Sequence, residues 1–149
     1  MPVTKADRAA EHIAGYTCIN DVSDREAQRA DKQFFRGKSL DTGGPCGPWI
    51  VTPDELPPLA SGLAISCRWN GELMQDSNTE HLIFPVDVLI AHISRHMTLL
   101  PGDIIATGTP GGVGAFREPP VFLKPGDTVD VTIEGIGTLG NPVTRWNPT

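Results

Sequence analysis

Turn-forming residues interrupt this chain repeatedly from Gly37 to its end. The 149 residues include 16 glycines and 14 prolines, which end helices and favour turns. Apolar runs of β-favouring residues recur between these breaks, so the pattern is not that of a disordered segment. A hydrophobic fraction of 39% is enough for one packed core. The sequence therefore predicts a single domain over residues 1–149, mostly β in an α+β arrangement, with a few short helices.

The N-terminal segment is predicted to alternate between helix and strand. A short helix is expected at Thr4–Ala14, capped by its first residue, and a buried strand at Tyr16–Ile19. The next helix is predicted for Ser23 to about Lys32, because its first residue and Glu26 have the spacing of a capping box. Asp21 is then expected at the end of a strand, directly before a helix.

A loop and a β-hairpin are predicted for the middle of the chain. Glycine and proline occur too often between Phe34 and Pro58 for long regular elements, apart from a short strand at Trp49–Thr52. Leu63–Trp69 alternates as a strand does, and Glu72–Gln75 is expected to return beside it. Asn70-Gly71 between them predicts a type I′ turn.

The C-terminal half is predicted to hold one helix and several strands. The helix is expected at Pro85–Met97, with an apolar stripe formed by Val88, Leu89, Ile93 and Met97. Two similar segments, Leu100–Ala106 and Lys124–Val131, each place Pro-Gly in a type II turn that should lead into a strand. Ile133–Val143 is expected to form a final hairpin.

Charge and cysteine content narrow the classes of partner and compartment. A formal charge of −6 argues against a nucleic-acid partner, because phosphate binding requires clustered lysine and arginine. Cys18, Cys46 and Cys67 contain no C-x-x-C pair, so the expectation is free thiols in a reducing cytoplasm. The first residues lack the apolar core of a signal peptide, and the apolar stretches are too short to span a membrane. We therefore expect a cytoplasmic protein with no membrane partner.

Several motifs, in a fixed order, resemble those of the fumarylacetoacetate hydrolase (FAH) superfamily over nearly all of the chain. They are Gly15-Tyr16-Thr17, Asn20-Asp21-Val22-Ser23, Gly37-Lys38-Ser39, Gly47-Pro48-Trp49, Asn70-Gly71-Glu72, PGDIIATGTP at 101–110 and PPVFLKPGD at 119–127. Within the superfamily, these motifs are similar to those of the bacterial acylpyruvase, hydroxyheptadienedioate isomerase and diketo sugar-acid hydrolase branches. The resemblance implies a mixed β-roll or barrel, often a homodimer.

The resemblance also implies roles for particular residues. Asp21 would be a ligand of a divalent metal, Mg²⁺ or Mn²⁺. Arg25, Gln28 and Lys38 would contact the oxygen atoms of the substrate, with Lys38 also catalytic, and Thr109 would hold a carboxylate or keto oxygen. The implied substrate is a small 2-oxo or 1,3-dicarbonyl acid, which a hard cation chelates through two oxygens. The implied reaction is hydrolytic C–C cleavage, decarboxylation or enol–keto isomerisation.

In the family, a Glu-x-Glu strand and a lid carrying the catalytic base precede the segment that this sequence matches. The expectation is therefore an N-terminally truncated FAH-like catalytic domain with an incomplete metal site. Another polypeptide or an upstream segment would supply the remaining ligands, and a homo-oligomer or a complex with such a partner chain is expected. One alternative is a catalytically silent, metal-free remnant that serves as a binding or oligomerisation module. Another is a truncated product that exposes the sheet edge left by the missing strands and therefore associates or aggregates.

Each candidate residue also has a purely structural interpretation. Asp21 favours a position just before a helix whatever its chemistry, and Lys38 is of a type that is usually solvated. Arg25 can pair with a neighbouring acidic residue. Thr109 and the proline after it can form a simple turn. With the family motifs we favour the ligand role of Asp21, and we expect the turn at Thr109 to serve both purposes. For Lys38 and Arg25 the two interpretations stay open.

Overall fold

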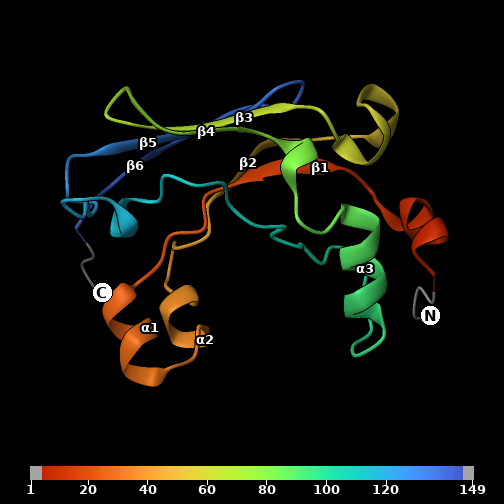
Figure 1. The fold of residues 1–149 in the computed structure, drawn as a ribbon, viewed down its shortest axis with the longest axis horizontal. Helices are drawn as coiled ribbons and strands as arrows, with labels where there is room; N and C mark the ends of the chain where they lie inside the picture. The colour runs from red at the N-terminus through yellow and green to blue at the C-terminus, as the bar shows by residue number, and fades with distance from the viewer. Residues whose placement is uncertain (1–4, 146–149) are drawn as a thin grey trace.

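The computed structural model describes residues 5–145 and shows an α+β fold with antiparallel sheets and short helices (Figure 1). The strands are β1 (Tyr16–Ile19), β2 (Cys46–Val51), β3 (Ala64–Trp69), β4 (Glu72–Asn78), β5 (Thr128–Ile133) and β6 (Gly137–Pro142). The α-helices are α1 (Arg25–Asp31), α2 (Phe35–Lys38) and α3 (Val86–Ser94). Short 3-10 helices lie at Ala6–His12, Pro53–Glu55, Pro58–Ala60, Thr79–His81 and Gly114–Phe116. The predicted fold class is confirmed.

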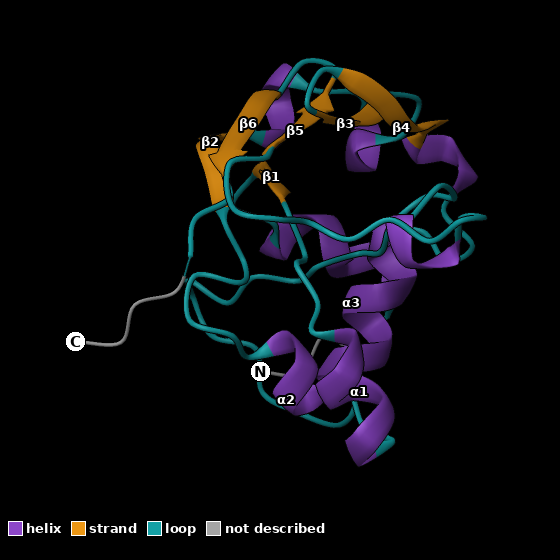
Figure 2. Ribbon diagram, turned by 90° about the vertical axis from the view of Figure 1, so that its left-hand side faces the viewer, coloured by secondary structure: helices purple, strands orange, loops and turns teal. Residues whose placement is uncertain are grey.

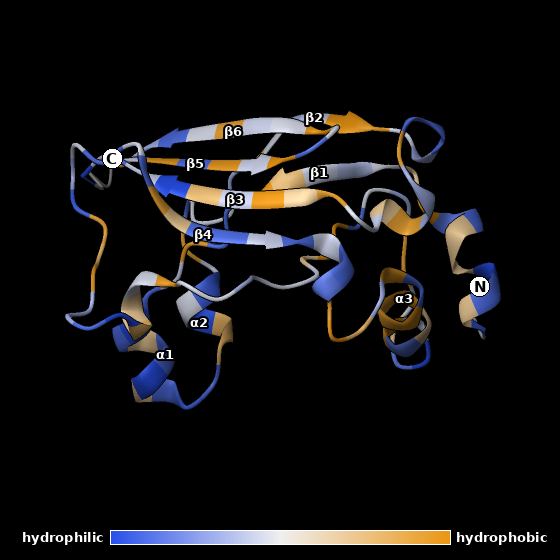
Figure 3. Ribbon diagram, turned by 45° about the horizontal axis from the view of Figure 1, so that its top comes forward, coloured by the Kyte–Doolittle hydropathy of each residue, from blue (hydrophilic) through white to orange (hydrophobic). Residues whose placement is uncertain are grey.

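The strands form two antiparallel sheets. One contains β1 and β2, and the other has the order β4-β3-β5-β6. The predicted turn between β3 and β4 is confirmed, because Asn70 and Gly71 have φ values of 49° and 83°, the left-handed values that a type I′ turn requires. The predicted final hairpin is confirmed as β5 and β6. β4 is an edge of the larger sheet and is largely hydrophilic (Figure 3), as is typical of edges that avoid pairing with other chains.

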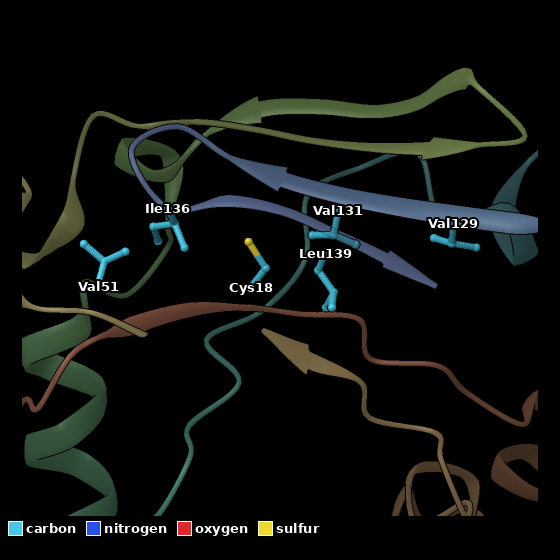
Figure 4. Close-up of a cluster of buried hydrophobic side chains, with 6 residues drawn as sticks. All are labelled: Cys18, Val51, Val129, Val131, Ile136 and Leu139. Atoms are coloured by element: carbon cyan, nitrogen blue, oxygen red, sulfur yellow. The ribbon is translucent and has the colours of Figure 1, made fainter. Parts of the chain in front are cut away.

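The main core lies between the two sheets, where β1 and β2 pack against β5 and β6 (Figure 1). Its buried members are Cys18, Val51, Val129, Val131, Ile136 and Leu139 (Figure 4). They come from β1, β2 and the β5–β6 hairpin, three segments far apart in sequence, so burial of their apolar surface holds the two sheets together. Burial also raises the pKa of the Cys18 thiol. This cysteine is therefore a packing residue that stays neutral.

A second, smaller cluster joins the N-terminal segment to α3. Ala9 and Ile90 are buried there, with Ile13 and Leu99 packed around them. Ala9 belongs to the 3-10 helix Ala6–His12, which occupies most of the predicted Thr4–Ala14 helix. The capping role of Thr4 lies outside the described residues. Across residues 5–145, no helix is long and apolar enough to cross a membrane.

The predicted apolar stripe of α3 is wrong. The buried residues of this helix are Ile90, Ala91 and Ser94, whereas Val88 and Met97 are exposed. Ile90 packs against Ala9 of the N-terminal 3-10 helix. The buried face of α3 is therefore the one that contacts this helix, and it is rotated from the predicted apolar stripe. The helix also ends at Ser94, three residues before the predicted end at Met97.

Two further predictions about regular structure require correction. The segment between Gly37 and Pro48, expected to be irregular, ends α2 and begins β2. The two Pro-Gly turns are confirmed, since Gly102 and Gly126 have φ values of 97° and 99°. Only the second leads into a strand, because the segment after Asp103 has no neighbouring strand in the described structure and runs as an extended loop.

Candidate active site

Asp21 lies two residues beyond the end of β1. Backbone hydrogen bonds hold this segment on both sides: Asn20 N donates to Pro45 O at 2.9 Å, and Val22 N donates to Gly43 O at 3.0 Å. The Asn20 side chain also donates to Asn141 Oδ1 at 3.1 Å. Asp21 is therefore fixed at the strand end, as the sequence predicts.

Helix α1 begins two residues later than expected and has a different cap. Asp24 is the N-cap, and its Oδ1 accepts from the backbone N–H groups of Glu26 and Ala27, both at 2.9 Å. Ser23 instead donates its hydroxyl to Asp21 O at 3.3 Å. The predicted capping box of Ser23 and Glu26 is thus wrong, because Asp24 takes the cap position and leaves Ser23 in the preceding turn.

Helix α2 carries Lys38 and packs directly on α1 (Figures 1 and 2). Gly37 makes this close approach possible, since a Cβ there would lie 2.8 Å from Asp24 O. Arg36 donates two hydrogen bonds of 2.7 Å to the carboxylate of Asp31 in α1, and this interaction lowers the pKa of Asp31. The close contact of Gly37 with Asp24 and the ion pair of Arg36 with Asp31 together hold α2 against α1.

This packing brings Lys38 to Asp21. The Lys38 ammonium donates to Asp21 Oδ2 at 2.5 Å, and the two side chains are 30% and 49% exposed. Both groups can therefore reach a ligand in solvent. The Lys38 ammonium can donate to a developing oxyanion, in competition with the Asp21 carboxylate that accepts from it here.

Arg25 and Gln28 lie on the same helix, one turn apart. Arg25 Nη1 donates to Gln28 Oε1 at 2.9 Å. The Arg25 guanidinium also lies over the ring of Phe116, 5.4 Å from its centroid. Among the ion pairs of residues 5–145, none includes Arg25. The predicted pairing with an acidic neighbour is not what holds this side chain.

Thr109 lies on a different element, the loop between α3 and β5, and contacts β4. Its hydroxyl accepts a hydrogen bond of 2.9 Å from Gln75 Nε2. The same loop contains Phe116, whose ring contacts Arg25. The structure thus groups Asp21 with Lys38, and Arg25 with Gln28 on the adjoining helix. It connects Thr109 to them only through its own loop.

The residues present do not make a complete site for a divalent metal. Within residues 5–145, no group of three or more His, Cys, Asp or Glu side chains is placed to hold a metal ion. Mg²⁺ is octahedral, with about six oxygen ligands, and usually combines several waters with one or two protein carboxylates and the oxygens of a substrate. Asp21 offers a single carboxylate, one oxygen of which already accepts from Lys38, and this does not meet that need.

An open hollow of about 500 Å³ lies beside the site and is lined by the loop Leu40–Pro45 and the end of β6. Neither Asp21 nor Lys38 lines it. The loop that borders it is the one that fixes the Asp21 segment through Gly43 and Pro45. The site residues themselves lie on an open surface rather than inside a closed cavity.

Two residues near the site had no signal in the sequence. Gln75 and Phe116 belong to no motif and contact the site residues Thr109 and Arg25 only through the fold. An aromatic residue at the turn of a glycine-rich loop, such as Phe116, is the feature that comes closest to a local signal. Gln75 is one of several polar residues on an edge strand and offers none.

The sequence matches a known protein family and several curated proteins. The family described as fumarylacetoacetate (FAA) hydrolase C-terminal matches residues 1–144. An uncharacterized protein of Staphylococcus aureus (strain USA300) is 54% identical over 131 residues, which cover 88% of this chain and 43% of that protein. The chain therefore spans less than half the length of this relative.

Solved structures of a fumarylacetoacetate hydrolase and of two isomerases are also similar to this chain. A fumarylacetoacetate hydrolase from Exiguobacterium antarcticum is similar with a TM-score of 0.90 and 48% identity, covering 95% of this chain and 50% of that one. A 2-hydroxyhepta-2,4-diene-1,7-dioate isomerase from Mycobacterium marinum gives a TM-score of 0.85 and 46% identity, covering 97% and 53%. A 5-carboxymethyl-2-hydroxymuconate delta-isomerase from Mycobacterium smegmatis has a TM-score of 0.85 and 49% identity, and the match covers 97% of this chain and 53% of that one.

Proposed function

Because this chain belongs to the fumarylacetoacetate hydrolase family, which includes hydrolases and isomerases, we propose that it forms part of an enzyme site for a small 2-oxo or 1,3-dicarbonyl acid. The reaction would be C–C cleavage, decarboxylation or enol–keto isomerisation. The observation that carries the proposal is the contact between Lys38 and Asp21, next to Arg25 and Gln28 on the adjoining helix.

The donors of this group suit an acid with two neighbouring oxygens. All three reaction types develop negative charge on a keto oxygen as an enolate forms, and the Lys38 ammonium would stabilise that charge. Arg25 would pair with the carboxylate of the acid. Arg25 can only donate hydrogen bonds, so its contact fixes Oε1 of Gln28 toward it and leaves Nε2 of Gln28 to donate to the ligand.

Members of this family are generally metal-dependent, and we propose Asp21 as one ligand of Mg²⁺ or Mn²⁺. The other ligands would come from outside these 149 residues, from an upstream segment or from a partner chain. A titration of the purified chain with Mn²⁺, followed by electron paramagnetic resonance and with Asp21→Ala as control, tests this assignment. Binding that Asp21→Ala does not weaken would contradict it.

We also propose that the chain works as a homo-oligomer or with a partner chain, in the cytoplasm. Exposed apolar side chains support an interface; they include Phe35, Trp49, Ile50, Ile83 and Phe84. The free thiols of Cys18, Cys46 and Cys67 fit a reducing compartment.

A second candidate function is a catalytically silent module for binding or oligomerisation. The metal ligands within residues 5–145 favour this second function, because the single carboxylate of Asp21 beside Lys38 does not hold a metal well. The same exposed apolar side chains would then serve the interface alone.

The role of Lys38 is tested by turnover of an acylpyruvate and of oxaloacetate with Mg²⁺ or Mn²⁺ present. Lys38→Met removes the positive charge and is expected to lower kcat by about 100- to 1,000-fold. Lys38→Arg retains the charge and should recover part of the rate. Lys32→Met is the matched control, because it removes an exposed lysine at the end of α1.

The outcomes separate the two candidate functions. Unchanged turnover by Lys38→Met would contradict the catalytic role of Lys38. Absence of turnover by the wild-type chain with either metal, together with absence of Mn²⁺ binding, would favour the silent module.

A further inference from the structure

Gln75 connects the edge strand β4 to the loop that carries Thr109. Its Nε2 donates two hydrogen bonds, one to Thr109 Oγ1 at 2.9 Å and one to Pro110 O at 2.7 Å. The side chain is half-buried, whereas Thr109 is exposed. The contact therefore reaches from the sheet to a hydroxyl that is open to solvent.

The chemistry of the partners fixes the orientation of the Gln75 amide. The carbonyl oxygen of Pro110 can only accept a hydrogen bond, so the nitrogen of the amide must face it. That nitrogen has two N–H groups, and the second is directed at Thr109 Oγ1. The hydroxyl oxygen of Thr109 is thus an acceptor in this contact.

A threonine hydroxyl has one proton to donate, and this contact leaves the proton unused. We infer that Gln75 is a positioning residue, which holds the Thr109 hydroxyl as a hydrogen-bond donor toward an anionic oxygen of the bound acid. The inference rests on the proposed function. It identifies Gln75 as a residue that acts through Thr109 without touching the substrate.

Other contacts hold the same loop independently of Gln75. Arg117 donates to Met74 O at 2.5 Å and to Gly112 O at 3.0 Å. Gly112 has a φ of 102°, and a Cβ there would clash with Met74 O, so the loop backbone lies directly against β4. Substituting Gln75 should therefore change the orientation of the Thr109 hydroxyl more than the path of the loop.

Oxalate is a suitable probe, because its two adjacent carboxylates match the carboxylate and the neighbouring keto oxygen of a 2-oxo acid and it lacks the C–C bond that the reaction would break. Its affinity for the full chain would be measured by calorimetry, with and without Mg²⁺. In Gln75→Glu the carboxylate can only accept, so the Thr109 proton turns to it and away from the ligand. We expect affinity about 10- to 100-fold weaker, as for loss of a hydrogen bond to a charged group.

A double-mutant cycle with Thr109→Val separates positioning from other effects. If Gln75 acts through Thr109, the charge-neutral variant Gln75→Met should weaken binding in the wild-type background and have no effect in Thr109→Val. Gln33→Glu, which makes the same charge change on an exposed loop, controls for repulsion of the anion. Thermal unfolding of each variant reports any loss of fold.

The results decide between positioning and simple loop support. Equal losses from Gln75→Met with and without Thr109→Val, or no loss in either background, would overturn the inference while leaving the proposed function intact. A wild-type chain that binds no oxalate with or without Mg²⁺ would overturn the proposed function together with the inference.

Discussion

At the residue scale, the start of α1 depends on which of two neighbouring side chains satisfies the free backbone N–H groups. Ser23 and Glu26 have the spacing of a capping box, but Asp24 accepts from the N–H groups of Glu26 and Ala27. A carboxylate at this position accepts two bonds at once and favours the positive end of the helix. The helix carries Arg25 at its first residue, so the choice of cap also sets where Arg25 lies.

Asp24→Ala should destabilise the protein by about 1 kcal/mol, the usual cost of losing an N-cap side chain. Ser23→Ala is the matched control and should change the free energy of unfolding by less than about 0.5 kcal/mol, as a surface change outside a cap does. Urea denaturation of the two variants measures both values. If Ser23→Ala lowered the free energy of unfolding more than Asp24→Ala does, Ser23 and not Asp24 would be the N-cap.

At the element scale, α3 shows that the most apolar side of a helix need not be the buried one. The helix buries Ile90 against Ala9 of the N-terminal 3-10 helix, while its apolar Val88 stays exposed. Hydrophobic periodicity gives the presence and approximate span of such a helix. The direction in which it faces depends on the segment that packs against it.

Ile90→Ala should lower the free energy of unfolding by about 2–4 kcal/mol, because it removes methylene groups from a packed cluster. Ile90 is 7% exposed and Val88 is 40% exposed. Val88→Ala should therefore cost less than about 1 kcal/mol, the value for a surface change. Similar losses in the two variants, measured by urea denaturation, would contradict the packing of α3 described above.

At the scale of the whole molecule, large apolar side chains remain on the surface next to a compact core. Ile83 and Phe84, consecutive residues before α3, are 88% and 60% exposed. Adjacent apolar side chains of this kind are typical of surfaces that are covered in an assembly. They support the proposed interface more directly than any motif does.

Sedimentation of the purified chain should give a mass above the 16.0 kDa of one copy. The double substitution Ile83→Ser with Phe84→Ser should shift that mass toward one copy, because it removes apolar surface that an interface would bury. Ile104→Ser is the matched control, since Ile104 is 64% exposed but lies in the loop after α3 and is not among the side chains assigned to the interface. A mass of one copy at every concentration tested would rule out the homo-oligomer, leaving the partner chain.

The local elements followed from short-range rules. The strand Tyr16–Ile19 formed where its β-favouring residues predict it, and Asn70-Gly71 formed the type I′ turn because asparagine and glycine adopt positive φ at low cost. The place of Asp21 after a strand also followed, since the strand end is set locally. The family motifs also predicted the fold class, which is confirmed, whereas the roles of the site residues stay a prediction.

The sequence by itself determined the turns, the positions of most strands and the family, because these depend on local residue patterns. Only the tertiary structure decided that Lys38 reaches Asp21, which requires Gly37 to let α2 approach α1. It also decided the contact of Gln75 with Thr109, 34 residues apart. Contacts of this kind join segments that are distant in the chain, so they depend on the packing of the whole fold and leave no periodic trace in the sequence.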